Sequence, residues 1–285
     1  MADNVPSAWT IPALRGSARR FPRALLTRAG HSVIGWQETI RDLGAFALIT
    51  LGAIATKFDH ARSLTRPMIR YEIYRCGIRL LPMICFIGLA LGLVIIGQTV
   101  SLQTKVGAQE YGGLIIVSVV VRELGPIIAA LLVLARAGAA NVVELGTTRA
   151  LGEVEALESL GIDPVHYLVV PRVIGMAVSI FGLTVYLVVV SLLSGWLFVF
   201  IQDVPMSPGD YFGQLAGALL WQDFVLLALK TFAFGGVIAV ITSFHGLAKP
   251  LKLEDVPVAT AQAVTECVVI CGVIDAMFLI VYLLI

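Results

Sequence analysis

Charged residues are scarce in this chain of 285 residues. They make up 14% of it, against about a quarter of an ordinary soluble domain. Hydrophobic residues make up 58%, and the mean hydropathy is +0.92. This composition excludes a typical soluble domain and gives no sign of a nucleic-acid partner. The sequence therefore predicts an integral membrane protein.

The sequence also lacks the common motifs of enzymes. It contains no G-x-x-x-x-G-K-[ST] phosphate-binding loop, no H-E-x-x-H, no G-x-S-x-G and no pair of C-x-x-C motifs. Its four histidines are scattered along the chain. We therefore expect no catalytic residue, no metal ligand, no cofactor and no ATP site in this chain.

Cysteine is rare as well, with four residues in all. Cys267 and Cys271 lie one helical turn apart in an apolar stretch, without a histidine or carboxylate beside them that would complete a metal site. A disulfide or a metal pair is the alternative, but we interpret both as small reduced apolar residues.

The first 30 residues lack an uninterrupted apolar stretch, so a cleavable signal peptide is not expected. Eleven of the 15 arginines lie at or before Arg79. This bias predicts a cytoplasmic N-terminus. We interpret 1–30 as a basic extension, either a membrane-surface segment or a disordered tail.

Five apolar stretches are long enough to cross a bilayer, which takes about 20 residues. They cover 80–101, 113–137, 168–201, 214–245 and 264–285, and the third and fourth have enough length to tilt, extend or break. Residues 31–58 join a charged half to an apolar half. An interfacial helix fits that stretch better than a sixth span.

The distribution of basic residues predicts the orientation. Arg136, Arg149, Arg172, Lys249 and Lys252 flank the loops 139–166 and 246–262, whereas the loops 102–112 and 202–213 hold one lysine. Positive charge favours the cytoplasmic side. The first two loops are therefore expected to be cytoplasmic and the other two to face outward.

The loop between the second and third spans is long and charged. We expect a discrete helix over about 149–160, ended by Gly161 in the left-handed conformation. Asp163 and Pro164 then have the residue types of an N-cap and a first-turn proline for the next helix. Such a structured loop is suited to contact a partner outside the bilayer.

Ionisable residues interrupt the apolar stretches at Arg122–Glu123, Arg136, Lys230 and Asp275. Each costs about 2.5–3.5 kcal/mol at a helix centre unless it is paired or faces water. Lys230 is the predicted cation for Glu123, either as a buried pair that fixes helix register or as part of a polar pocket for an amphiphile headgroup. Arg136 lies near the inner end of its span and can extend to the interface.

Small residues recur in the first span at Gly88, Gly92 and Gly97. They permit close helix packing, including across a dimer axis, and the aliphatic residues between them could equally contact acyl chains. The sequence does not separate these two interpretations.

A series of motifs on either side of the charged loop resembles the MlaE/YrbE permease family, the membrane subunits of Mla- and Mce-type ABC lipid transporters. The matching residues are Arg122–Pro126, Arg136–Ala140, Glu144–Thr147, Arg149, Glu153, Ala156–Glu158, Gly161–Pro164 and Pro171–Arg172. The likeness extends from about residue 31 to the C-terminus, which gives a permease domain over 31–285 after the extension.

The resemblance implies an all-α membrane protein with an N-terminal interfacial helix, five transmembrane helices and a cytoplasmic coupling helix between spans two and three. The lipid-binding residues it implies are Arg122, Glu123, Lys230, Ile95 and Leu102. The residues it implies for coupling to the ATPase are Glu144, Arg149, Glu153, Glu155 and Glu158.

The resemblance also implies partners and a location. The chain would form a homodimer in the bacterial inner membrane with a cytoplasmic MlaF-like ATPase, which binds ATP. It would meet a hexameric MlaD-like MCE-domain protein and, as a further option, a STAS-domain accessory protein. Phospholipid would move between the inner membrane and the MCE channel, which contributes to outer-membrane lipid homeostasis.

Two other functions fit the intramembrane charges less well. An ion-coupled secondary transporter could use Glu123, Lys230 and Asp275 as a relay, but the inverted repeats typical of such carriers are not evident. A scaffold that only anchors an ATPase would not need those charges at all.

Overall fold

The computed structural model describes residues 41–53, 62–106, 112–202, 207–248 and 251–284. All regular structure within these residues is helical, and five helical segments are long and apolar enough to cross a membrane. The predicted all-α membrane fold is confirmed. The predicted extension 1–30 lies outside the described residues. Of the interfacial helix predicted over 31–58, the structure describes 41–53, which are helical, and the rest lies outside the described residues.

The first two spans are each built from several short helices joined end to end. The first contains α2 (Arg62–Cys76), η1 (Ile78–Leu80), α3 (Leu81–Leu91), η2 (Gly92–Ile96) and α4 (Gly97–Val106). The second contains α5 (Gly112–Ile116), η4 (Val117–Leu124), α6 (Gly125–Val133), η5 (Leu134–Gly138) and α7 (Ala139–Ala150). Elements η2, η4 and η5 are π-helical turns, which often occur at functional positions.

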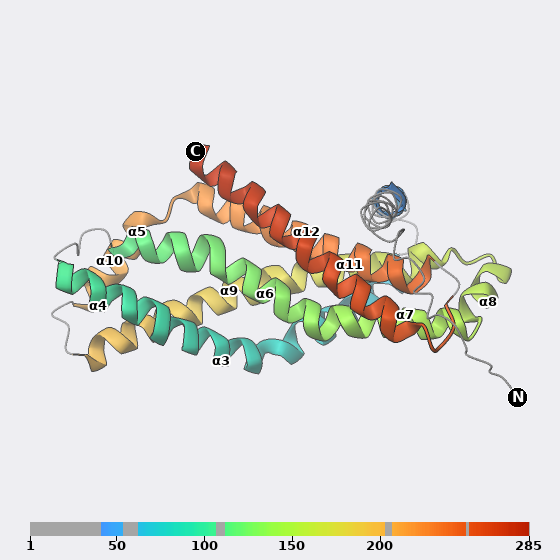
Figure 1. The fold of residues 1–285 in the computed structure, drawn as a ribbon, viewed down its shortest axis with the longest axis horizontal. Helices are drawn as coiled ribbons and strands as arrows, with labels where there is room; N and C mark the ends of the chain where they lie inside the picture. The colour runs from blue at the N-terminus through green and yellow to red at the C-terminus, as the bar shows by residue number, and fades with distance from the viewer. Residues whose placement is uncertain (1–40, 54–61, 107–111, 203–206, 249–250, 285) are drawn as a thin grey trace, which may run out of the picture. The chain divides into compact units, whose positions relative to one another are not determined.

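The remaining spans are simpler. They are η6 (Val165–Val169) with α9 (Val170–Ile201), then α11 (Trp221–Leu247) and α12 (Val256–Leu284). Two short helices lie between spans, α8 (Glu153–Ser159) and α10 (Pro208–Ala218). Figure 1 shows α8 at one end of the helices and α4, α5 and α10 at the opposite end. The loops therefore alternate between the two ends as predicted.

Several predicted boundaries were wrong. Helical structure continues from the first span back to Arg66 and from the second on to Ala150, because these helices extend beyond their apolar stretches. The fourth predicted span, 214–245, breaks at Leu219 and Leu220, where the backbone is extended. Asp223 accepts a hydrogen bond from the Leu220 amide (3.0 Å) and so starts α11 anew.

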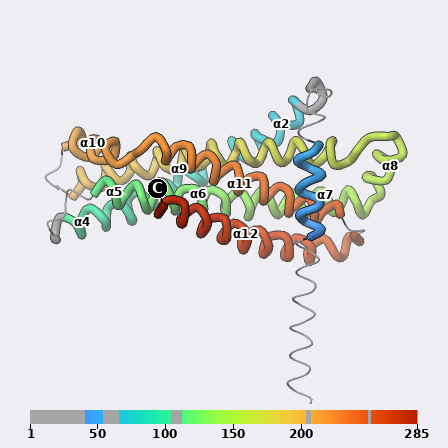
Figure 2. Tube along the Cα trace, turned by 90° about the horizontal axis from the view of Figure 1, so that it is seen from above, coloured from blue at the N-terminus to red at the C-terminus, as the bar shows by residue number. Residues whose placement is uncertain are grey.

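Helix α9 lies at the centre of the packing. It contacts α2, α3, α6 and α11, and α11 in turn contacts α7 and α12 (Figure 2). The glycines of the first span face α9 of the same chain: a Cβ on Gly92 would lie 1.8 Å from Ser194 Oγ, and one on Gly97 would lie 2.7 Å from the Phe198 ring. These two glycines therefore serve packing within the chain.

A short α10 closes the end opposite α8. Ser207 caps it by accepting a hydrogen bond from the Asp210 amide (3.1 Å), and Pro208 occupies its first turn. Tyr211 is buried and donates to the Leu192 carbonyl of α9 (3.1 Å). Burial raises the pKa of the Tyr211 phenol, which therefore stays protonated and keeps donating.

The α9–α11 contact gives a direct stability test. A Cβ on Gly235 would lie 2.4 Å from the backbone Cα of Ala177, whereas one on Gly236 meets nothing within 4 Å. We expect Gly235→Ala to force the helices apart and destabilise the protein by about 1–3 kcal/mol. The neighbouring Gly236→Ala is the matched control and should be neutral. Thermal unfolding in detergent measures both, and equal midpoints would contradict this packing.

Candidate functional site

Lys230 on α11 is the centre of a charged cluster within the spans. Its side chain is fully buried. Its Nζ donates hydrogen bonds to Glu123 Oε2 (3.1 Å) and to the carbonyl of Arg122 (2.9 Å), and it forms an ion pair with Asp275 Oδ1 (2.7 Å). Three oxygen atoms therefore surround the ammonium of Lys230, and two of them accept its hydrogen bonds. We call Lys230, Glu123 and Asp275 the lysine cluster. The contact that the sequence predicted between Glu123 and Lys230 is present.

The lysine cluster has one carboxylate more than it has cations. The side chains of Glu123 and Asp275 are 26% and 21% exposed. Glu123 Oε1 is buried and has no hydrogen-bond partner among the described residues. An unpaired carboxylate oxygen at the edge of a buried site can accept from a hydroxyl or ammonium group of an amphiphile.

Arg122 points away from the lysine cluster. Its Nε and Nη2 lie 2.9 and 3.1 Å from the two oxygens of Asp223, and its guanidinium lies 5.3 Å from the centre of the Tyr282 ring. Adjacent residues on a helix point about 100° apart, which explains why Arg122 and Glu123 have separate partners. The sequence alone did not identify Asp223 as the partner of Arg122, because an acidic residue at the start of a helix is equally well explained as a helix cap.

Ile95 and Leu102, the other two residues implied for lipid binding, lie on the first span. Ile95 packs against an apolar cluster that includes Ile96 and Val120. The Leu102 side chain is 65% exposed. The structure thus brings Glu123 and Lys230 together. The polar contacts of Lys230 come from η4 and α12, whereas Ile95 and Leu102 lie on the first span.

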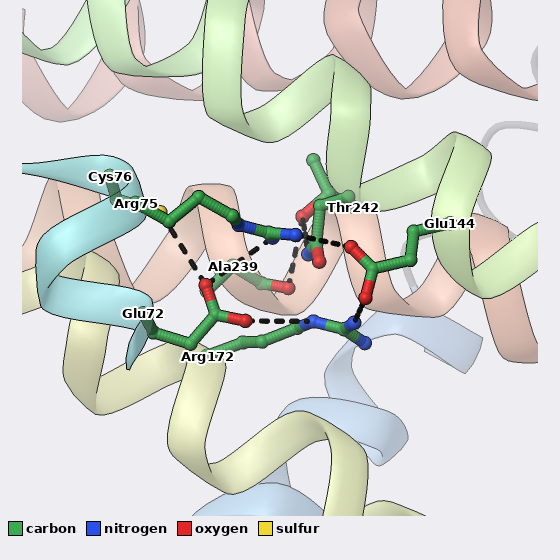
Figure 3. Close-up of polar contacts among 8 residues, drawn as sticks. Glu72, Arg75, Cys76, Glu144, Arg172, Ala239 and Thr242 are labelled. Atoms are coloured by element: carbon green, nitrogen blue, oxygen red, sulfur yellow. Dashed lines mark hydrogen bonds and ion pairs between the residues drawn. The ribbon is translucent and has the colours of Figure 1, made fainter. Parts of the chain in front are cut away.

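A second charged cluster joins three spans near the α8 end of the helices (Figure 3). Arg172 of α9 contacts Glu144 of α7 (2.7 Å) and Glu72 of α2 (3.5 Å). Arg75 of α2 contacts Glu72 (3.3 Å) and also pairs with Glu144. We call these four residues the arginine cluster. Beside it, Asn141 donates to Thr242 of α11 (3.0 Å).

The sequence analysis missed the arginine cluster. Glu72 and Arg75 lie about 70 and 100 residues from Glu144 and Arg172, and no local pattern joins them. A single signal was available: Glu72 is an acidic residue in a strongly basic N-terminal region. Glu144, implied for coupling, has both carboxylate oxygens paired within this cluster.

The other residues that the resemblance implies for coupling lie on or beside α8. Glu153, Glu155 and Glu158 are exposed, while Val154 is buried against the protein. Arg149 belongs to α7 and not to the short helix, which begins at Glu153 and not near 149. It contacts Glu155 (3.3 Å).

Glycine at both ends defines the short helix. Gly152 and Gly161 each have φ of +76°, a conformation that other residues adopt only with strain. Gly161 donates to the Glu158 carbonyl and Ile162 to the Leu157 carbonyl, the hydrogen bonds of a Schellman motif. Asp163 accepts from the Val165 amide (3.1 Å). The predicted helix stop at Gly161 and cap at Asp163 are confirmed.

The sequence of this chain matches a known family of membrane permeases. The family model "Permease MlaE" matches residues 69–281. The chain is 24% identical to the "Intermembrane phospholipid transport system permease protein MlaE" of Haemophilus influenzae over 85% of this chain and 90% of that protein. It is 27% identical to the "Probable ABC transporter permease protein RT0041" of Rickettsia typhi, over 79% and 86%.

Another relative comes from a plant. "Protein TRIGALACTOSYLDIACYLGLYCEROL 1, chloroplastic" of Arabidopsis thaliana is 30% identical over 65% of this chain and 51% of that protein. The family match covers all five spans in whole or large part, together with both charged clusters and α8. This chain is a multi-pass membrane protein that belongs to the MlaE permease family.

Proposed function

We propose that this chain is the membrane subunit of an ABC transporter that moves phospholipids between the bacterial inner membrane and an MCE-domain channel. The observation that carries the proposal is the lysine cluster. A fully buried lysine with two carboxylates and an unpaired Glu123 oxygen offers a polar contact for a headgroup among apolar spans. The name of the Haemophilus relative supports phospholipid as the substrate.

The energy source would be a separate cytoplasmic ATPase that contacts α8. The short helix presents three glutamates to solvent, and its two left-handed glycines fix its direction relative to α7 and η6. Closure of two ATPase subunits would move α8 and, through α7, the second span as a rigid body. Two copies of the chain would form the lipid path, with ATP bound only by the partner.

Apolar walls would hold the acyl chains during transfer. Each buried CH₂ contributes about 0.8 kcal/mol relative to water, so a lipid that leaves the bilayer needs a continuous apolar path. An MCE-domain partner would supply the path beyond the membrane. The end of the helices with α10 would then face outward and the end with α8 would face the cytoplasm, as the basic residues predict.

The experiment that tests this function is native mass spectrometry of the complex expressed with its genomic neighbours, followed by an ATP-dependent lipid-transfer assay. The proposal expects two copies of the chain, two ATPases, bound phospholipid and transfer that requires ATP. A monomer without ATPase whose transport follows an ion gradient would instead support the ion-coupled carrier. The contacts of Lys230 with Glu123 and Asp275 make that carrier the second candidate.

Charge reversal on α8 tests the docking surface. We expect Glu153→Lys to lower ATPase recovery in co-purification at least about tenfold. A surface of the ATPase that accepts the glutamates of α8 would be positively charged, and the new lysine would face it with a like charge, which costs several kcal/mol at an interface. Glu155→Lys should act similarly, although it also breaks the contact with Arg149.

Glu254→Lys is the matched control for that experiment. It makes the same charge change at an exposed position between α11 and α12 and should leave ATPase recovery unchanged. Normal recovery with Glu153→Lys, or an equal loss with Glu254→Lys, would show that α8 is not the docking surface.

A further inference from the structure

A cavity of about 380 Å³ lies beside the arginine cluster, between α2, η6, α9 and α7. One part of its wall is apolar or aromatic, with Met68, Tyr71, Tyr167 and Leu168. The other part consists of charged side chains from the arginine cluster, among them Glu144 and Arg172. A cavity with one apolar wall and one charged wall is suited to an amphiphilic ligand.

The arginine cluster beside the cavity contains an enclosed donor without a partner among the described residues. Arg172 is only 5% exposed, and its Nη1 has no hydrogen-bond partner among the described residues. Its other two nitrogens contact Glu72 and Glu144. A buried guanidinium N–H without a partner is costly, and a phosphate oxygen is among its best acceptors.

The net charge of the arginine cluster selects among headgroups. Two arginines balance two glutamates, and the Glu144 side chain is 47% exposed. A ligand with a phosphate alone would bring unpaired negative charge close to Glu72 and Glu144. A ligand with a phosphate and an ammonium could place one near Arg172 and the other near Glu144.

The position along the second span agrees with a headgroup. The helical stretch from Glu123 to Glu144 covers about 31 Å at 1.5 Å per residue. That is close to the thickness of the hydrocarbon core. Since Glu123 lies within the spans, Glu144 lies outside the hydrocarbon core, toward the interface on the α8 side. Tyrosines such as Tyr71 and Tyr167 are typical of that level.

We propose that this cavity is a second phospholipid site, which binds a zwitterionic phosphate–ammonium headgroup at the α8 end of the helices. The phosphate lies at Arg172, the ammonium lies at Glu144, and the start of an acyl chain lies along Met68 and Leu168. The proposal goes beyond the proposed function, because it adds a site about 30 Å from the lysine cluster.

The test fills the cavity without touching the ion pairs. Met68→Trp places a larger side chain on the apolar wall, and Ile78→Trp is the matched control at an exposed position that does not line the cavity. The purified protein, with its ATPase where the two co-purify, is stripped of lipid. It is then titrated with phosphatidylethanolamine, phosphatidylglycerol or water-soluble glycerophosphoethanolamine, and native mass spectrometry counts the bound molecules.

We expect the wild type and Ile78→Trp to bind phosphatidylethanolamine at one site more tightly than phosphatidylglycerol, and Met68→Trp to weaken that site about tenfold. Equal binding of both lipids, or unchanged binding in Met68→Trp, overturns the proposal. Equal competition by glycerophosphoethanolamine would assign the cavity to a soluble phosphoethanolamine and overturn the lipid assignment. Loss of ATPase from Met68→Trp with unchanged lipid would identify the cavity as a protein contact.

The outcome is separable from the proposed function. A Lys230 variant that keeps the phosphatidylethanolamine site while it loses the other lipid leaves the second site standing. Loss of the cavity site alone, with ATP-dependent transfer intact, leaves the proposed function standing.

Discussion

Replacing Lys230 with alanine is expected to destabilise the protein by about 3–5 kcal/mol and to remove lipid bound at the lysine cluster. The substitution leaves the carboxylates of Glu123 and Asp275 near each other around a position where the lysine side chain was fully buried. Two unpaired carboxylates in a medium of low dielectric constant repel each other. Thermal unfolding in detergent and the lipid content of the purified protein measure the two effects.

The control is Lys252→Ala, at an exposed position between α11 and α12, which should change stability by no more than about 0.5 kcal/mol. A triple variant separates folding from binding. Lys230→Met with Glu123→Gln and Asp275→Asn removes the buried charges together, and we expect it to recover most of the stability without recovering lipid. If the triple variant also recovers lipid, the lysine cluster is structural only.

Replacing Arg172 with methionine is expected to cost about 3 kcal/mol of stability. The substitution keeps most of the side-chain volume but leaves Glu72 and Glu144 with Arg75 as their one remaining partner in the cluster. Because Glu72 is 5% exposed, water cannot replace the lost guanidinium. Unfolding by denaturant or heat measures the loss.

Arg136→Met is the control for Arg172, since Arg136 is exposed near the same end of the second span. It should change stability by at most about 0.5 kcal/mol. The two charged clusters are about 30 Å apart, so the effects of Arg172→Met and Lys230→Ala should add in a double variant. A much smaller combined loss would mean that the clusters share one cooperative contact.

Local patterns in the sequence were sufficient to predict much of the fold. Apolar length identified the five spans, and glycine and aspartate chemistry located the helix stop at Gly161 and the cap at Asp163. The cost of intramembrane charge was enough to pair Lys230 with Glu123. Each of these predictions depends on one residue type in one environment, which a sequence displays directly.

Other features depend on where distant segments meet. The partners of Arg172 come from α2 and α7, and no spacing in the chain signals that they meet. Hydropathy also misplaces helix ends, because a helix continues past the bilayer wherever its backbone is not interrupted. The break before Trp221 is an error of the other kind. The residues there are apolar, so hydropathy predicts one continuous span, whereas the backbone is extended at Leu219 and Leu220.

The continuity of the second span has a mechanical consequence. Residues Gly112–Ala150 form one helical segment of about 58 Å, which carries Glu123 on the way and ends just before α8. Such a segment is a lever arm: a tilt of about 5° about one end displaces the other end sideways by about 5 Å, roughly half the distance between packed helix axes. A small rocking movement at α8 is therefore enough to move the opposite end of this helix sideways by about 5 Å relative to its neighbours.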